Sequence, residues 1–266
     1  MMHRVLLVIA MLVLPVRVES YEIATHRDLV RVAGARSIAD QLLRDDLGLD
    51  GGLRTTIRGK ALEDCLIDGG AEEDDFPRFL NHFHNPLASD WSQAGLGGAV
   101  GQSAILWAQN PSQSAPSWSW QDARRLYLDA LTKSASTDRD KGLAATFEAL
   151  GRQMHLIQDA ASPGHARNDP HILYNYETLI ENLRVVEAVT FAGWRDSPPD
   201  TPGVPDVGWR ALDSNPLAPV AVARLVDTDR YVGTNPAVTT ETLIGLSEYT
   251  NANFFSEDRI FTENDR

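Results

Sequence analysis

Apolar residues recur at helical spacing along five stretches of the chain, whereas the alternating pattern of β-strands is nearly absent. Apolar positions three and four residues apart give each stretch one face that can pack against a core. The last stretch begins with Thr-Thr-Glu, a sequence typical of a helix cap. We therefore predict an all-α fold. The five predicted helices cover residues 29–43, 123–131, 143–161, 176–191 and 239–255.

Two segments between the predicted helices are rich in glycine or proline and lack this periodicity: residues 95–101 and residues 198–219. Such a composition is typical of loops, and we interpret both segments as long ordered loops on a helical scaffold. The chain has no evident internal repeat and no linker that clearly divides it. The sequence therefore predicts a single compact multi-helix domain.

The first twenty residues have the pattern of an export signal. Arg4 gives a basic start, and residues 5–16 form an apolar run that is too short to span a membrane comfortably. Val18 and Ser20 supply the small residues expected before a cleavage site. We predict a signal peptide at residues 1–20, a mature domain at residues 21–266 and a secreted or periplasmic protein. An uncleaved anchor or a misassigned start is the alternative.

Composition narrows the classes of partner. The chain has 266 residues, with 24 Lys and Arg against 37 Asp and Glu, and a formal net charge of −13. This acidity disfavours tight binding to duplex nucleic acid. The single cysteine, Cys65, excludes an intrachain disulfide framework. We therefore expect the stability of the exported protein to depend on packing and on bound metal.

The most specific chemical pattern is the segment LGRQMHLIQDAASPGH at residues 150–165. His155 and Asp159 are four residues apart on a predicted helix, so their side chains lie on one face about one turn apart. Pro163 is predicted to end this helix, so that His165 follows in a loop that can fold back. The pattern suits two or three ligands of one metal ion. Taken alone, it also fits a surface His–Asp pair.

Further histidines each have a carboxylate or an amine within reach. One acidic run precedes a His-Phe-His-Asn-Pro element, although most of such a run is usually a solvated face. Another histidine lies six positions before a glutamate, and a third lies five positions after the predicted mature N-terminus. These residues are the acidic run 72–75, His82, His84, His171, Glu177 and His26. Nitrogen and oxygen ligands without thiolate suit zinc, and their number indicates more than one ion.

In this arrangement the chain resembles the zinc-dependent phospholipase C / P1 nuclease superfamily. The resemblance is carried by Leu-Gly-x-x-x-His-x-x-x-Asp-x-x-x-Pro-x-His at residues 150–165, by the element at residues 82–86, and by a free N-terminus near a histidine. It extends over residues 21–177. Members of this superfamily are all-helical and hold three zinc ions in a cleft, so the resemblance implies the same fold and cofactors here.

The resemblance also implies a ligand for each ion. The first zinc would be held by Asp74, His82, His155 and Asp159. Asp159 would bridge to a second zinc, which His26 and the α-amino and carbonyl groups of Tyr21 would complete. The third zinc would be held by His165, His171 and Glu177.

Two departures from the family pattern affect this assignment. Tyr21 stands where the best-known members have tryptophan, a tolerable change because the main chain supplies the ligands. The spacing between His171 and Glu177 is longer than is common, which makes His171 the weakest ligand of the set. Asp75 is a substitute for Asp74, and we expect His84 to pack in the core or line the cleft.

These features lead to a zinc-dependent phosphodiester hydrolase as the expected function. The elements at residues 82–86 and 163–168 are closer to the bacterial phospholipase C branch than to the nucleases. We expect cleavage of phosphatidylcholine-like phospholipids to diacylglycerol and a phosphorylated headgroup. Asp74 is the candidate general base. The enzyme would be a monomer that can contact a membrane surface peripherally.

Two alternatives stay open. A zinc-dependent single-strand nuclease would need aromatic side chains on which bases stack. The candidates for that role are Trp91, Trp107, Trp118 and Trp120, although aromatic residues in helical domains more often pack in the core. The other alternative is a catalytically silent protein that is stabilised by metal and binds a surface or a partner.

Overall fold

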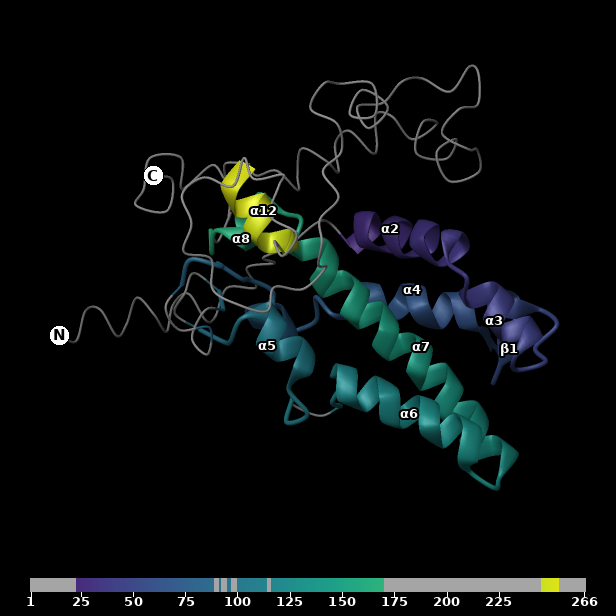
Figure 1. Cartoon of the computed structure of the whole chain (residues 1–266). Helices are drawn as coiled ribbons and strands as arrows, with labels where there is room; N and C mark the ends of the chain where they lie inside the picture. The colour runs from purple at the N-terminus through teal and green to yellow at the C-terminus, as the bar shows by residue number, and fades with distance from the viewer. Residues whose placement is uncertain are drawn as a thin grey trace, which may run out of the picture.

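The computed structural model describes residues 23–88, 91, 95–96, 100–113, 116–169 and 245–253. These residues are mostly helical, and their one sheet has only two short strands, which confirms the predicted all-α fold (Figure 1). The helices are α2 (Ile23–Arg36), α3 (Ala39–Asp45), α4 (Leu62–Glu72), α5 (Ala104–Gln109), α6 (Trp120–Thr132), α7 (Ser136–Asp159), α8 (Pro163–Ala166) and α12 (Leu246–Asn253). Among them, no helix is both long and apolar enough to cross a membrane.

Short elements connect the first helices. Two 3-10 turns, η1 (Gly52–Arg54) and η2 (Arg78–Asn81), follow α3 and α4 respectively. Strands β1 (Thr56–Ile57) and β2 (Lys60–Ala61) form an antiparallel hairpin. The predicted signal peptide, the predicted helix at 176–191 and the predicted loop at 198–219 lie outside the described residues.

The predicted helix at 29–43 is two helices, α2 and α3. Ser37 causes the break, because its hydroxyl donates to the main-chain oxygen of Gly34 at 2.8 Å and accepts from the main-chain nitrogen of Ala39 at 3.2 Å. One side chain thus satisfies both the end of α2 and the start of α3. Helices α6 and α7 match predicted helices at 123–131 and 143–161, and α12 covers part of the one at 239–255.

One prediction about the end of α7 was wrong. Helix α7 ends at Asp159, and Pro163 is the first residue of a further short helix, α8. Proline suits this position because its fixed φ is helical and the first helical N–H needs no intrahelical partner. His165 therefore lies within α8 rather than in a loop.

The core lies where α2, α4 and α6 pack around α7 (Figure 1). Val30, Leu62 and Phe147 are among its buried side chains, which come from α2, α4 and α7. Burial of each such side chain stabilises the fold by about 1.5–3 kcal/mol. The sequence pattern did not predict α4, because this short helix contains two glycines, Gly69 and Gly70, that weaken its propensity.

Gly69 of α4 and Gly151 of α7 bring the main chains of the two helices into direct contact. A Cβ atom at Gly151 would lie 1.9 Å from the main-chain oxygen of Leu66, and one at Gly69 would lie 2.0 Å from that of Glu148. Only residues without a side chain permit so close a crossing. The crossing places the segment after α4 beside the C-terminal half of α7.

Candidate metal centre

Four buried side chains from three parts of the chain converge at the end of α7. His155 and Asp159 lie on its last turns, Asp74 follows α4, and His82 follows η2. The side chains of His155, Asp159 and His82 are at most 1% exposed, and that of Asp74 is 7% exposed. We refer to these four residues as the tetrad.

The distances within the tetrad are those of ligands around one ion. His82 Nδ1 lies 3.1 Å from Asp159 Oδ2 and 3.4 Å from Asp74 Oδ1. His155 Nε2 lies 3.2 Å from Asp159 Oδ2, 3.5 Å from Asp74 Oδ1 and 3.2 Å from His82 Nδ1. Four tetrahedral zinc ligands with bonds of about 2.0–2.2 Å would lie about 3.3–3.6 Å apart. Five of the six separations in the tetrad are thus close to those of a single tetrahedral site, and His82, His155 and Asp159 together form one metal-compatible group.

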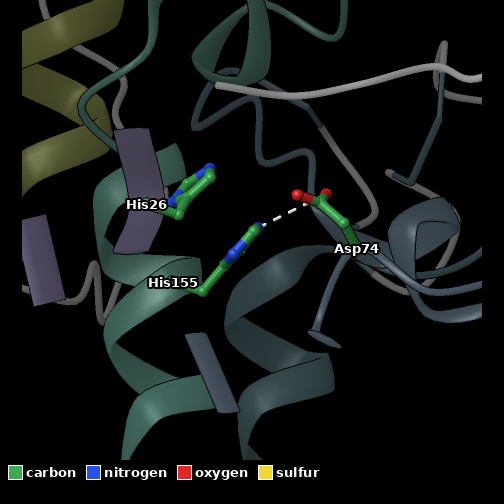
Figure 2. A group of neighbouring side chains, drawn as sticks. All are labelled: His26, Asp74 and His155. Atoms are coloured by element: carbon green, nitrogen blue, oxygen red, sulfur yellow. Dashed lines mark ion pairs between the residues drawn. The ribbon is translucent and has the colours of Figure 1, made fainter. Parts of the chain in front are cut away.

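Asp159 also reaches two histidines outside the tetrad. Its Oδ1 lies 3.4 Å from His26 Nε2, and its Oδ2 lies 3.6 Å from His165 Nδ1. The rings of His26 and His155 stack at a centroid distance of 3.7 Å, and Asp74 faces the edge of His155 (Figure 2). His26, Asp74 and His155 form a second group with ligand atoms within 4.8 Å of one another. Asp159 is therefore placed to serve more than one site.

Each of these four imidazoles donates one ring N–H to an amide oxygen. The pairs are His26 Nδ1 with Gln158 Oε1 (2.6 Å), His82 Nε2 with the Glu73 carbonyl (3.1 Å), His155 Nδ1 with the Gly70 carbonyl (2.6 Å) and His165 Nδ1 with the His82 carbonyl (3.0 Å). Because an amide oxygen only accepts, the contacting nitrogen must carry the proton. Metal-binding histidines in proteins are oriented in this way.

This protonation pattern leaves nitrogen lone pairs facing carboxylate oxygens. When neutral, His26 Nε2, His82 Nδ1 and His155 Nε2 each present a lone pair to Asp159. Two acceptors that face each other repel unless a proton or a cation lies between them. Neither oxygen of Asp159 accepts a directed hydrogen bond from the described part of the chain. The donor set therefore fits a metal cation, and a buried carboxylate requires such a partner.

Without a cation, protons lie between the imidazole nitrogens and the carboxylate oxygens. Burial would lower the pKa of His82, but the carboxylates of Asp159 and Asp74 raise it to about 9. The same carboxylates raise the pKa of His155 against the effect of burial. Burial and the charge of His155 lower the pKa of His26 to about 4. Burial would raise the pKa of both Asp74 and Asp159, but the imidazoles around them hold both below the ordinary range.

We expect binding of a divalent cation in the tetrad at pH 7 to release about two protons, one each from His82 and His155, because a metal ligand must be a neutral imidazole. The pKa of His82 without metal, about 9, is above 7, so affinity rises from pH 7 to 9. The rise is about tenfold per pH unit for each displaced proton. Calorimetric titration in buffers of different ionisation enthalpy measures the release. A binding enthalpy that is independent of the buffer would contradict it.

The structure brings six of the predicted site residues together: His26, Asp74, His82, His155, Asp159 and His165. The other three, Tyr21, His171 and Glu177, lie outside the described residues. Asp75, the substitute for Asp74, is exposed. His84 is buried, with Nδ1 2.7 Å from the hydroxyl of Ser103, and it belongs to neither metal-compatible group.

Sequence reasoning missed the residues that support the tetrad and the neighbouring His26. Gly70 and Gln158 act through amide oxygens, and nothing in a residue pattern marks a main-chain acceptor. Glu73 belongs to the acidic run that we expected to be mostly solvated, yet its side chain is fully buried. The signal that could have indicated its burial is Arg78, a basic residue five positions later that pairs with it.

Comparison with protein-family models and with curated proteins gives no match for this chain. The structure itself shows buried histidine and aspartate groups close enough to hold a metal ion.

Proposed function

We propose that the protein is a zinc-dependent phosphodiester hydrolase. The observation that carries this proposal is the tetrad, in which each of two carboxylates lies 3.1–3.5 Å from both imidazole nitrogens in a buried site. Oxygen and nitrogen ligands without thiolate suit Zn²⁺. Each histidine is oriented by an amide oxygen, which supports a site built for metal.

The tetrad would hold one zinc ion, and the remaining predicted ligands would hold two more. His26 and Asp159, with the α-amino and carbonyl groups of Tyr21, would hold the second ion. His165, with His171 and Glu177, would hold the third. In phosphodiester hydrolysis, bound divalent ions neutralise the non-bridging oxygens, lower the pKa of water and stabilise the leaving alkoxide.

We assign Asp74 the role of proton acceptor for the attacking water. Its side chain, at 7%, is the most exposed of the tetrad, so this is the side from which water can approach. The imidazoles of His155 and His82 outweigh the effect of burial and lower its pKa, so the carboxylate is ionised at neutral pH. His82, His155 and Asp159 are at most 1% exposed, so bulk water does not reach them.

Among phosphodiesters, we propose phosphatidylcholine-like phospholipids as the substrate of an exported enzyme. The motifs at residues 82–86 and 163–168 support this choice through their resemblance to the bacterial phospholipase C branch. Trp107, one candidate for stacking on nucleic acid bases, is 5% exposed and donates its indole N–H to Glu73 at 2.8 Å. It is therefore part of the interior rather than a surface on which a base can stack.

We expect the zinc-loaded protein to hydrolyse p-nitrophenylphosphorylcholine and phosphatidylcholine vesicles, and a chelator to abolish both activities. Release of nitrophenol and of phosphocholine measures them. Single-stranded DNA is the comparison substrate. Cleavage of DNA without cleavage of phosphatidylcholine would overturn the lipid assignment. A zinc-loaded protein that cleaves neither would be a silent metal-binding protein, contrary to the proposal.

A further inference from the structure

A carboxylate that belongs to neither metal-compatible group lies next to the tetrad, with Glu73 Oε1 3.9 Å from His82 Nε2. The Glu73 side chain is fully buried and is held by a bidentate ion pair with Arg78, with distances of 2.7 Å to Nε and 2.9 Å to an Nη nitrogen. The indole N–H of Trp107 donates to the same carboxylate at 2.8 Å, and an Nη nitrogen of Arg152 lies 3.5 Å away. Bidentate and charge-assisted bonds of this kind fix geometry strongly.

The partners of Glu73 come from the elements that carry the ligands. Arg152 lies on α7, three residues before His155, and also donates to the main-chain oxygen of Glu72 at 2.7 Å. Arg78 begins η2, which ends just before His82. The Glu73 carboxylate therefore joins the segment that supplies Asp74 and His82 to the helix that supplies the other half of the tetrad.

Glu73 also determines the orientation of one ligand through its main chain. Its carbonyl oxygen accepts the Nε2–H of His82 at 3.1 Å, which leaves His82 Nδ1 directed toward Asp159 and His155. Asp74 is the next residue in the chain. A shift of the Glu73 main chain would thus displace two ligands of the tetrad at once.

We propose that Glu73 is a positioning residue for the metal ligands, an inference that rests on the metal centre of the proposed function. It acts through its bonds to Arg78, Trp107 and Arg152, and it belongs to neither metal-compatible group. Its carboxylate offsets two buried guanidinium groups, so the charge is needed as well as the shape.

The test is the affinity of Glu73→Gln for Zn²⁺, measured by competition with a chromophoric chelator. The variant keeps the size of the side chain and loses its charge. We expect the dissociation constant to rise about 10- to 100-fold, the usual effect of removing a group that orients a metal ligand. We also expect Zn²⁺ to raise the melting temperature of the variant less than that of the wild type.

Asp122→Asn is the matched control. Asp122 is also a buried carboxylate, but its partners are Ser117, Ser119 and Arg125 at the start of α6. Its loss should lower the melting temperature equally with and without Zn²⁺ and leave the zinc affinity unchanged. The same behaviour in Glu73→Gln would show a purely structural role and would overturn the proposal.

Trp107→Phe keeps the proposal testable if Glu73→Gln does not fold. It removes one donor to Glu73 and retains an aromatic ring beneath Arg78. We expect a zinc affinity below that of the wild type, and an unchanged affinity would overturn the positioning role. A wild-type protein that binds no Zn²⁺ would overturn the metal centre as well, so the two failures are distinguishable.

Discussion

Asp159→Asn should lose more than about 100-fold in zinc affinity, because even groups that only orient metal ligands contribute 10- to 100-fold. Asp159 lies within 3.6 Å of nitrogens on His26, His82, His155 and His165. An amide at this position removes the charge that all of them face. Metal analysis after dialysis against buffered Zn²⁺ measures the loss.

The stability of Asp159→Asn should fall for the same reason. Zinc at about 1,000 times its dissociation constant would stabilise the wild type by about 4 kcal/mol, and the variant should lose most of this increment. Asp138→Asn is the control, because Asp138 is an exposed carboxylate in the first turn of the same helix. It should change stability by less than about 0.5 kcal/mol. Equal zinc content in the wild type and Asp159→Asn would contradict the role of Asp159.

Gly151→Ala should destabilise the protein by about 3 kcal/mol, because the added methyl group has no space where α7 crosses α4. Its Cβ would lie 1.9 Å from the main-chain oxygen of Leu66, which cannot move without shifting the helix. Moving α4 also moves the Gly70 carbonyl, which holds His155. Urea denaturation should show the loss of stability, and zinc affinity should fall with it.

Gly34→Ala is the control for this crossing. An added Cβ at Gly34 would lie 3.2 Å from a terminal carbon of Leu66, a flexible side chain that can move aside. Alanine also favours the helix by about 1 kcal/mol over glycine. We expect little or no loss of stability. If Gly151→Ala were as stable as Gly34→Ala, the direct contact of the two main chains would be disproved.

Local sequence patterns predicted the parts of the fold that local physics determines. The apolar period gave α6 and most of α7, and the spacing of four residues placed His155 and Asp159 on one face of a helix. The break at Ser37 was not predicted because the apolar pattern continues across it. The hydroxyl bonds of Ser37 that separate α2 from α3 leave no mark in that pattern. Pro163 was interpreted as a terminator although it begins the next helix.

In the site, too, the sequence indicated the candidate ligands but not the contacts that support them. His26, Asp74 and His82 were grouped with the α7 motif through a family resemblance, and the structure places them beside it. Their binding of zinc stays a prediction. The supporting contacts depend on tertiary structure: the Gly70 carbonyl reaches His155 because α4 crosses α7 closely. No single-sequence pattern records which main-chain oxygen a distant helix will meet.

The zinc content of the purified wild-type protein, determined by elemental mass spectrometry after saturation and removal of free metal, tests the central claim most directly. We expect three zinc ions per chain, bound by a protein whose mature sequence begins at Tyr21, and their loss on treatment with a chelator. A chain that retains no zinc after saturation would contradict the metal centre and the hydrolase built on it.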